Sequence, residues 1–334
     1  MTLSVGLVGA GRMGRLHLGK IGDLEGVKVV GICDTEESRA RALTRLFRGR
    51  AYANLTEMLQ NENLDVLYVC NPVQSHGDAA RLAASEGIHL FLEKPLTLDL
   101  REGRELVEAV EKADIICAVG YQYRYQGVLE KIHEAIGTDP ISLAHGYWYW
   151  TVPPVAATRS KEVSGGPIVD QLTHLIDLGR LFAGEVERVS AEYTLNTRWD
   201  EDFDNWDGSS VILRFESGAI GSFSSTLSLY PSLIEKPNMS YMGLELFAKN
   251  KMARFRPDNA TIFRSDHITE WSNLGGDIDH EFIRACRLRD PTLVRSPIRE
   301  AYKSLAVSLA CNEAALRGES VKVREFIREM DGLL

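Results

Sequence analysis

The chain has 334 residues, 44% of them hydrophobic and 25% charged, as expected of a globular protein long enough for two domains. Its net charge of -9 argues against nucleic acid and against an anionic membrane surface as partners. No stretch approaches the roughly 18 apolar residues of a membrane-spanning helix, and the apolar start is too short for a secretory signal. We therefore expect a cytoplasmic protein.

The first 120 residues alternate between short apolar runs and helical patterns. The runs are rich in Val, Ile and Leu without polar alternation, which is typical of parallel strands covered on both faces. Strands are predicted at 3–8, 27–33, 66–70, 89–92 and 115–119, and helices at 13–21, 36–47, 55–60, 77–85 and 100–112. This repeat predicts a doubly wound α/β domain over residues 1–122.

The pattern changes after this point, and aromatic-rich strands with polar alternation take over. Strands are predicted at 143–150, 188–196, 209–215, 219–229 and 244–255, and helices at 128–136, 168–182, 279–288 and 298–316. Alternation of this kind indicates a sheet with one covered face. Residues 123–334 are therefore predicted to form an α+β domain with an open, mostly antiparallel sheet and helices on one face.

A glycine-rich turn follows the first predicted strand and opens the first helix. Gly9, Gly11 and Gly14 form a G-x-G-x-x-G motif around Arg12 and Met13. Glycines permit a tight turn and close approach of the backbone to a pyrophosphate, and the helix N-terminus supplies unpaired N–H groups. In this strand–turn–helix context the motif predicts a dinucleotide site of Rossmann type.

The second predicted strand ends at Asp34, 20 residues after the last glycine of the motif. A carboxylate at this position accepts hydrogen bonds from the adenosine ribose hydroxyls and repels a 2′-phosphate. The sequence therefore predicts NAD as the cofactor, with NADP disfavoured, although Arg39 lies close enough in sequence to soften that preference.

Four further segments follow in order along the chain: NPVQSH at 71–76, EKPL at 93–96, GYQYRY at 120–125 and GGPIVDQLTH at 165–174. With the glycine loop, they resemble the Gfo/Idh/MocA oxidoreductases, named for glucose–fructose oxidoreductase and inositol dehydrogenase. The resemblance implies a Rossmann domain, an open-faced α/β domain and a homodimer or homotetramer formed through the second sheet. It also implies catalytic lysine and histidine positions at Lys94 and His174.

Elementary chemistry supports the same residues. Removing a hydride from a secondary alcohol also requires removal of the hydroxyl proton, and a positioned base contributes about 10²–10⁴-fold. Histidine as a residue type has a pKa near neutral pH, so His174 is the natural candidate for the base. Asp170, four residues earlier on a predicted helix, lies on the same face. Lys94 follows a buried strand, where an ammonium group stabilises a developing alkoxide. Lys94 and His174 both remain candidates for the base.

Further site residues are expected near the ends of strands and in the following loops. Cofactor contacts are predicted for Gly9, Gly11, Arg12, Met13, Gly14, Asp34, Asn71, Pro72, His76, Glu93, Lys94 and Gln122, and substrate contacts for Lys94, Arg124, Trp150, Arg159, Asp170 and His174. Structural alternatives stay open at three positions. His76 could instead cap a helix, and Glu93 could instead anchor the end of a strand. Trp148 and Trp150 share one face of a strand and could instead pack in the core or at an interface.

No metal site is predicted. The five cysteines are isolated and none forms a C-x-x-C pair, so they are expected to be buried thiols in a reducing compartment. The acidic stretch 200–207 lacks the glycine and terminal glutamate of an EF-hand loop.

The leading functional prediction is an NAD-dependent dehydrogenase or reductase acting on a secondary alcohol or ketone of a sugar, cyclitol or related polyol. Two alternatives have the same fold. One is a non-catalytic nucleotide-binding regulator, which has no need of Lys94, Asp170 and His174 together. The other is a redox-assisted glycosidase, which oxidises its sugar only transiently.

Overall fold

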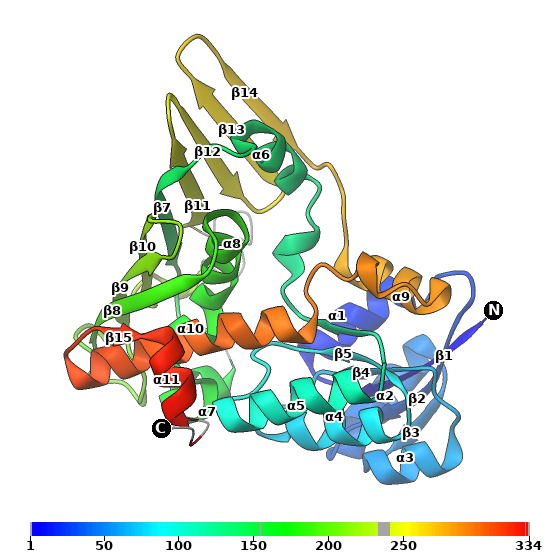
Figure 1. The fold of residues 1–334 in the computed structure, drawn as a ribbon. Helices are drawn as coiled ribbons and strands as arrows, with labels where there is room; N and C mark the ends of the chain where they lie inside the picture. The colour runs from blue at the N-terminus through cyan, green and yellow to red at the C-terminus, as the bar shows by residue number, and fades with distance from the viewer. Residues whose placement is uncertain (1, 154, 233–240, 331, 333–334) are drawn as a thin grey trace. The chain divides into compact units, whose positions relative to one another are not determined.

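The computed structural model describes residues 2–153, 155–232, 241–330 and 332. They form two compact units: Met1–Gln122 with Asp277–Tyr302, and Tyr123–Gly276 with Lys303–Leu334 (Figure 1). The sequence predicted that residues 277–302 belong to the second domain, 123–334. In the structure they return to the first unit. This return is held by the packing of helix α9 (Ile278–Leu288) on α1 (Arg12–Ile21) and by a hydrogen bond from the Val119 N–H to the Ser296 carbonyl oxygen.

The first unit contains a six-stranded sheet in the order β3-β2-β1-β4-β5-β6, with every pair parallel, as the sequence predicts. The strands are β1 (Leu3–Val8), β2 (Val27–Cys33), β3 (Arg50–Tyr52), β4 (Val66–Val69), β5 (His89–Leu92) and β6 (Cys117–Val119). Strand β3 was not predicted, because its three residues form no apolar run. The strand order reverses between β1 and β4, and in sheets of this kind ligands bind at the carboxyl ends beside such a reversal.

Helices connect these strands. Besides α1 they are α2 (Glu37–Phe47), α3 (Leu55–Asn61), α4 (His76–Ser85) and α5 (Leu100–Lys112), with a short 3-10 turn at Val73–Ser75. The returning segment adds α9 and a 3-10 turn at Pro291–Leu293. Asn54, Asp99 and Asp277 each accept a backbone N–H at a helix start, which satisfies donors that the helix leaves unpaired. The unit therefore has the strand–helix alternation expected from the sequence.

The second unit contains a nine-stranded sheet in the order β14-β13-β12-β11-β7-β10-β9-β8-β15. The strands are β7 (Ile141–Tyr149), β8 (Val186–Thr194), β9 (Gly208–Phe215), β10 (Ile220–Thr226), β11 (Tyr241–Ala248), β12 (Lys251–Arg256), β13 (Asn259–Arg264), β14 (Ile268–Ser272) and β15 (Val321–Lys322). Only β7 and β10 pair in parallel among the pairs described, so the prediction of a mostly antiparallel sheet is confirmed.

One predicted strand, 244–255, is in fact a hairpin of β11 and β12. Asn250 adopts a positive φ of 59° in the turn between them, a conformation that asparagine tolerates better than most residues. The apolar pattern continues through both strands, so the turn was hidden in the sequence.

Helices cover one face of this sheet. They are α6 (Val128–Ile136) and α8 (Thr173–Ala183), and a π-helical turn (Ile168–Leu172) leads into α8. The shorter α7 (Lys161–Ser164) packs on the 3-10 turn that precedes it. The structure also has 3-10 turns at Gln122–Tyr125 and Ala156–Arg159, and two further helices, α10 (Ile298–Arg317) and α11 (Val323–Met330).

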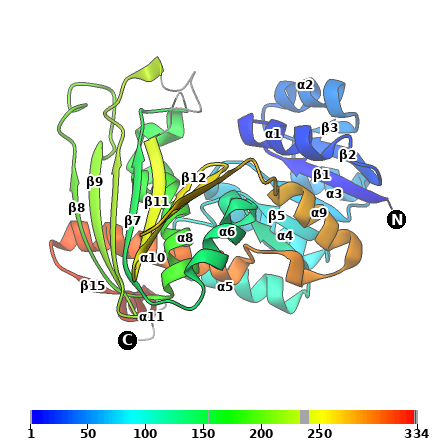
Figure 2. The same ribbon diagram turned by 90° about the horizontal axis from the view of Figure 1, so that it is seen from above.

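The packing of these helices leaves the two faces of the sheet unlike each other. In Figure 2, α8 lies along β7 and β11, and α6 lies beside β12 and β13. Side chains on the opposite face alternate with the buried ones and include the exposed Ile212, Ile220 and Tyr241. No helix in the described ranges is long and apolar enough to cross a membrane.

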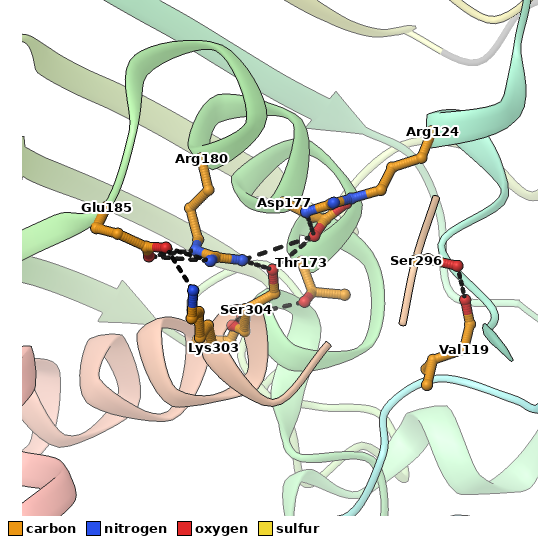
Figure 3. Close-up of polar contacts among 10 residues, drawn as sticks. Val119, Arg124, Thr173, Asp177, Arg180, Glu185, Ser296, Lys303 and Ser304 are labelled. Carbon is orange, nitrogen blue, oxygen red and sulfur yellow. Dashed lines mark hydrogen bonds and ion pairs between the residues drawn. The ribbon is translucent and has the colours of Figure 1, made fainter. Parts of the chain in front are cut away.

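A buried cluster of charges anchors α8 within this unit (Figure 3). Arg124 donates from Nε and Nη2 to the two carboxylate oxygens of Asp177, at 2.6 and 2.8 Å. Ser304 on α10 donates to Asp177 Oδ1 at 2.6 Å and accepts from Arg180 Nη1 at 2.7 Å. Arg180 also contacts Glu185. Asp177 thus places a negative charge against the buried guanidinium groups of Arg124 and Arg180.

Replacing Asp177 with alanine is therefore expected to lower the free energy of unfolding of this unit by about 3–5 kcal/mol, because the buried Arg124 guanidinium loses the carboxylate that it is paired with and Arg180 loses one of its two carboxylates. All five tryptophans lie in the second unit, so urea denaturation followed by tryptophan fluorescence reports on it. Glu134→Ala, which removes an exposed ion pair with Lys131, is the control and should cost less than about 1 kcal/mol. Equal losses in the two variants would contradict the assignment.

Candidate active site

The glycine loop has the shape that a dinucleotide needs. A Cβ on Gly9, whose φ is +92°, would lie 2.4 Å from the backbone of Asn71, and a Cβ on Gly14 would lie 2.1 Å from the Gly9 carbonyl oxygen. A Cβ on Gly11 would meet nothing within 4 Å. Gly9 and Gly14 are thus required by the turn and by helix packing, whereas Gly11 caps α1 beside open space. These residues fit a pyrophosphate at the helix N-terminus.

Asp34 lies directly beside this loop. Its Oδ2 accepts the Ala10 N–H at 2.8 Å and its Oδ1 accepts the Glu36 N–H at 2.9 Å. An ionised carboxylate has about four acceptor sites, so both oxygens retain capacity for ribose hydroxyls. Arg12 is exposed and Met13 half-buried in the first turn of α1.

The loop after β4 contains Asn71, Pro72 and His76. The Asn71 side-chain oxygen is buried and has no hydrogen-bond partner among the described residues, so it offers an acceptor at the carboxyl end of the sheet. Pro72 is exposed and begins the short 3-10 turn.

His76 does not reach outward, in contrast to the cofactor contact predicted for it. Its ring is buried, with Nδ1 3.0 Å from the Pro95 carbonyl oxygen and Nε2 2.9 Å from that of Asn71. Burial lowers the pKa of His76, against the opposing effect of the backbone contacts. The residue ties the Asn71 loop to the Lys94-Pro95 loop.

Glu93 is likewise turned into the protein rather than toward a cofactor. It is buried; Oε1 contacts His17 Nε2 at 2.8 Å, and Oε2 accepts the Lys94 N–H at 3.0 Å. The strand-end anchor left open at this position is what the structure shows. Lys94 and Gln122 are half-buried at the ends of β5 and β6.

The second unit holds Asp170 and His174 on the segment where the predicted helix begins. Asp170 lies in the π-helical turn and His174 in the first turn of α8. The π-helical turn packs on β7 and β10, and such turns occur frequently at functional sites. His174 is 4% exposed and Asp170 is half-buried.

Two aromatic side chains flank the His174 ring. Trp148 stacks on it with ring centroids 5.9 Å apart and an interplanar angle of 26°, and Tyr123 meets it edge-on at 5.3 Å and 70°. The Tyr123 hydroxyl points to Met242 Sδ at 3.4 Å, and burial raises the pKa of that hydroxyl. Tyr123 was not among the predicted site residues, and the predicted substrate contact was Trp150 rather than Trp148.

Three predicted substrate contacts, Arg124, Trp150 and Arg159, differ in burial and in their hydrogen-bond partners. Arg124 is buried in its ion pair with Asp177, so the structure gives it a role in holding α8, and the predicted substrate contact is not supported. Trp150 is half-buried just past β7, and its backbone N–H donates to the Thr226 carbonyl oxygen. Arg159 is exposed and donates to the Asp202 carbonyl oxygen at 2.6 Å.

No group of three or more potential metal ligands occurs among the residues that the structure describes. All five cysteines are free thiols. The arrangement therefore offers a dinucleotide loop in the first unit and an enclosed, aromatic-flanked imidazole in the second.

Comparison with known proteins agrees with these features. Residues 3–121 match the family described as "Oxidoreductase family, NAD-binding Rossmann fold", and residues 135–239 match the "GFO/IDH/MocA C-terminal domain". Together these segments span about two thirds of the chain.

Individual relatives are similar over two thirds or more of their own length. Myo-inositol 2-dehydrogenase from Thermotoga maritima is 30% identical over 66% of this chain and 67% of its own length. D-apiose dehydrogenase from Paraburkholderia graminis is 28% identical over 97% of this chain and 90% of its own length. The structure of the WlbA dehydrogenase from Bordetella pertussis, in complex with NADH and UDP-GlcNAcA, superposes with a TM-score of 0.80 at 25% identity, covering 96% and 99% of the two chains. The chain therefore belongs to the Gfo/Idh/MocA family of NAD-binding Rossmann-fold oxidoreductases.

Proposed function

We propose that this protein is an NAD-dependent oxidoreductase that transfers a hydride between the nicotinamide ring and a secondary alcohol or ketone of a sugar, cyclitol or related polyol. The observation that carries the proposal is the glycine loop, where Gly9 and Gly14 leave no room for a side chain while Gly11 caps α1 beside open space, next to Asp34. The relatives named as inositol and apiose dehydrogenases support the polyol class.

In this proposal, NAD when bound supplies the hydride acceptor. The N–H groups at the start of α1 and the open face of Gly11 bind the pyrophosphate, and Asp34 binds the adenosine ribose. Arg12, Met13, Asn71, Pro72 and Gln122 complete the cofactor contacts. The list is shorter than the sequence predicted, since His76 and Glu93 face inward.

The chemical step needs a base and a stabilised alkoxide. Lys94, Asp170 and His174 are the proposed catalytic residues: His174 or Lys94 takes the hydroxyl proton, and the Lys94 ammonium stabilises negative charge on that oxygen. Trp148 and Tyr123 exclude water from two sides of the His174 ring. Trp150 and Arg159 are proposed substrate contacts.

We also propose a homodimer or homotetramer formed through the open sheet of the second unit. The exposed Ile212, Ile220 and Tyr241 support it, because they place apolar groups on the face opposite the helices. The five free thiols, four of them buried, support a cytoplasmic location.

A pair of glycine variants tests the cofactor site. Gly14→Ala places Cβ against the Gly9 carbonyl oxygen and is expected to destabilise the protein by about 1–3 kcal/mol or more. Gly11→Ala has room for Cβ in the free protein, so its melting temperature should fall by at most about 3 °C, while its NAD affinity falls at least about tenfold. Scanning and titration calorimetry measure both quantities. NAD binding by Gly11→Ala as tight as that of the wild type would overturn the placement of the pyrophosphate.

The preference for NAD over NADP is tested at Asp34. Asp34→Asn keeps an oxygen to accept the Ala10 N–H but removes the charge that repels a 2′-phosphate. The ratio of kcat/KM for NADP to that for NAD is expected to rise about tenfold or more. Glu36→Gln, which removes a neighbouring exposed carboxylate, is the matched control and should leave the ratio unchanged. A rise of the same size in the control would assign the preference to bulk charge.

The catalytic roles are tested with cyclitols and aldoses, following NADH absorbance. Lys94→Ala and His174→Ala should each lose about 10²–10⁴-fold in kcat and still bind NAD. Added imidazole should restore part of the activity of His174→Ala alone, and added methylamine part of that of Lys94→Ala alone. Lys112→Ala and His133→Ala, exposed residues of the same types, serve as controls. Turnover that survives both active-site substitutions would refute these roles.

A further inference from the structure

His17 lies in the interior of the first unit, held between two carboxylates. It is on the buried side of α1, one turn after Gly14. Its Nδ1 is 2.6 Å from Asp279 Oδ1 on α9, and its Nε2 is 2.8 Å from Glu93 Oε1 at the end of β5. The side chains of all three residues are less than one tenth exposed. Two acceptors facing both ring nitrogens require two donors, which only the imidazolium form provides.

The electrostatics agree with this geometry. Burial alone lowers the pKa of His17, but the hydrogen bonds and charges of Asp279 and Glu93 outweigh burial and raise that pKa to about 9. Burial raises the pKa of Glu93, yet His17 and Lys94 together hold it below its usual value. Lys20, one turn further along α1, shares Asp279 at 3.4 Å. His17 is therefore a cation at neutral pH, and Glu93 is an anion.

The second oxygen of Glu93 connects this pair to the catalytic loop. Glu93 Oε2 accepts the backbone N–H of Lys94 at 3.0 Å. A Cβ on Gly120, the residue after β6, would lie only 2.8 Å from the same oxygen. The backbone at Gly120 therefore also restricts the position of the carboxylate. Since one oxygen is held by His17 and the other holds the Lys94 amide, the orientation of the Lys94 backbone depends on a side chain of α1.

We propose that His17 is a positioning residue for Lys94, acting through Glu93, and that it links the helix of the dinucleotide loop to the loop that carries the catalytic lysine. The proposal rests on the proposed function only in giving Lys94 a catalytic role. The alternative is that the three buried residues stabilise the fold and nothing more.

Two isosteric substitutions separate these roles. The amide of glutamine reaches about as far as Nε2 of histidine, and that of asparagine about as far as Nδ1. His17→Gln therefore keeps a donor for Glu93, whereas His17→Asn keeps a donor only for Asp279. Both variants lose the same positive charge, so a purely structural role predicts similar consequences for both.

The first readout needs no substrate. With ¹⁵N-labelled lysine, the Lys94 amide signal is identified by its absence in Lys94→Arg, and its hydrogen exchange is measured with and without NAD. We expect exchange at least about tenfold faster in His17→Asn than in the wild type, and within about threefold of the wild type in His17→Gln. Equal exchange in the two variants overturns the proposal, whatever the enzyme acts on.

The second readout is the kinetic consequence. At a temperature where circular dichroism shows both variants folded, kcat should fall about 10–100-fold in His17→Asn with NAD affinity unchanged, and at most about threefold in His17→Gln. Glu93→Gln has only one acceptor oxygen, so it cannot accept from His17 and from the Lys94 amide at once. It should behave like His17→Asn and replaces that variant in the test if His17→Asn does not fold. Equal kcat losses in His17→Asn and His17→Gln refute the proposal. Exchange that follows the expected order while the wild type turns over no polyol refutes the proposed function instead.

Discussion

The structure depends on the compensation of charges that are buried away from water. An isolated ion in a protein interior is too costly to persist, so each must find a partner of opposite charge or hydrogen-bond donors. The first unit meets this requirement with His17 between Glu93 and Asp279, and the second with Asp177 between Arg124 and Arg180. Each cluster adjoins a proposed catalytic residue, since Glu93 precedes Lys94 and Asp177 follows His174 by three residues on α8.

The parallel sheet imposes a second constraint. Because β1 and β4 are neighbours at the reversal of strand order, the chain leaving each strand arrives at the same edge. Gly9 and Asn71 approach so closely there that a side chain on Gly9 would overlap the Asn71 backbone. The glycine requirement at position 9 therefore follows from the sheet topology, whereas a side chain at Gly11 would meet only open space in the free protein.

Much of the fold was predictable from local patterns, because buried parallel strands and half-covered antiparallel strands differ in the spacing of their apolar residues. The turn at Asn250 was not predictable, because β11 and β12 on either side of it continue the same alternation of apolar and polar residues. The short edge strands β14 and β15 have too few residues to show a period. The π-helical turn has no sequence signal distinct from that of the helix it joins.

The sequence predicted which strand ends the candidate residues follow, but not always where their side chains point. A residue after a parallel strand lies at the carboxyl edge of the sheet, and the structure has Asp34, Asn71 and Lys94 just after β2, β4 and β5, as predicted. His76 and Glu93 occupy the same edge, yet their side chains point inward to carbonyl groups and to His17. Strand-end position alone cannot distinguish these orientations, because they depend on partners far away in sequence: Glu93 pairs with a residue 76 positions earlier, and His17 with one 262 positions later.

The buried ionic clusters are better explained by geometry than by stability. Replacing a buried ion pair with packed apolar side chains often leaves a protein equally stable, so stability alone does not require ions at these positions. Charged hydrogen bonds, however, are directional, and a bidentate or doubly bonded group has one favourable orientation. Hydride and proton transfer demand reacting atoms held to within about half an ångström. A cluster that orients Glu93, and through it Lys94, satisfies that demand in a way that apolar packing, which tolerates small rotations, does not.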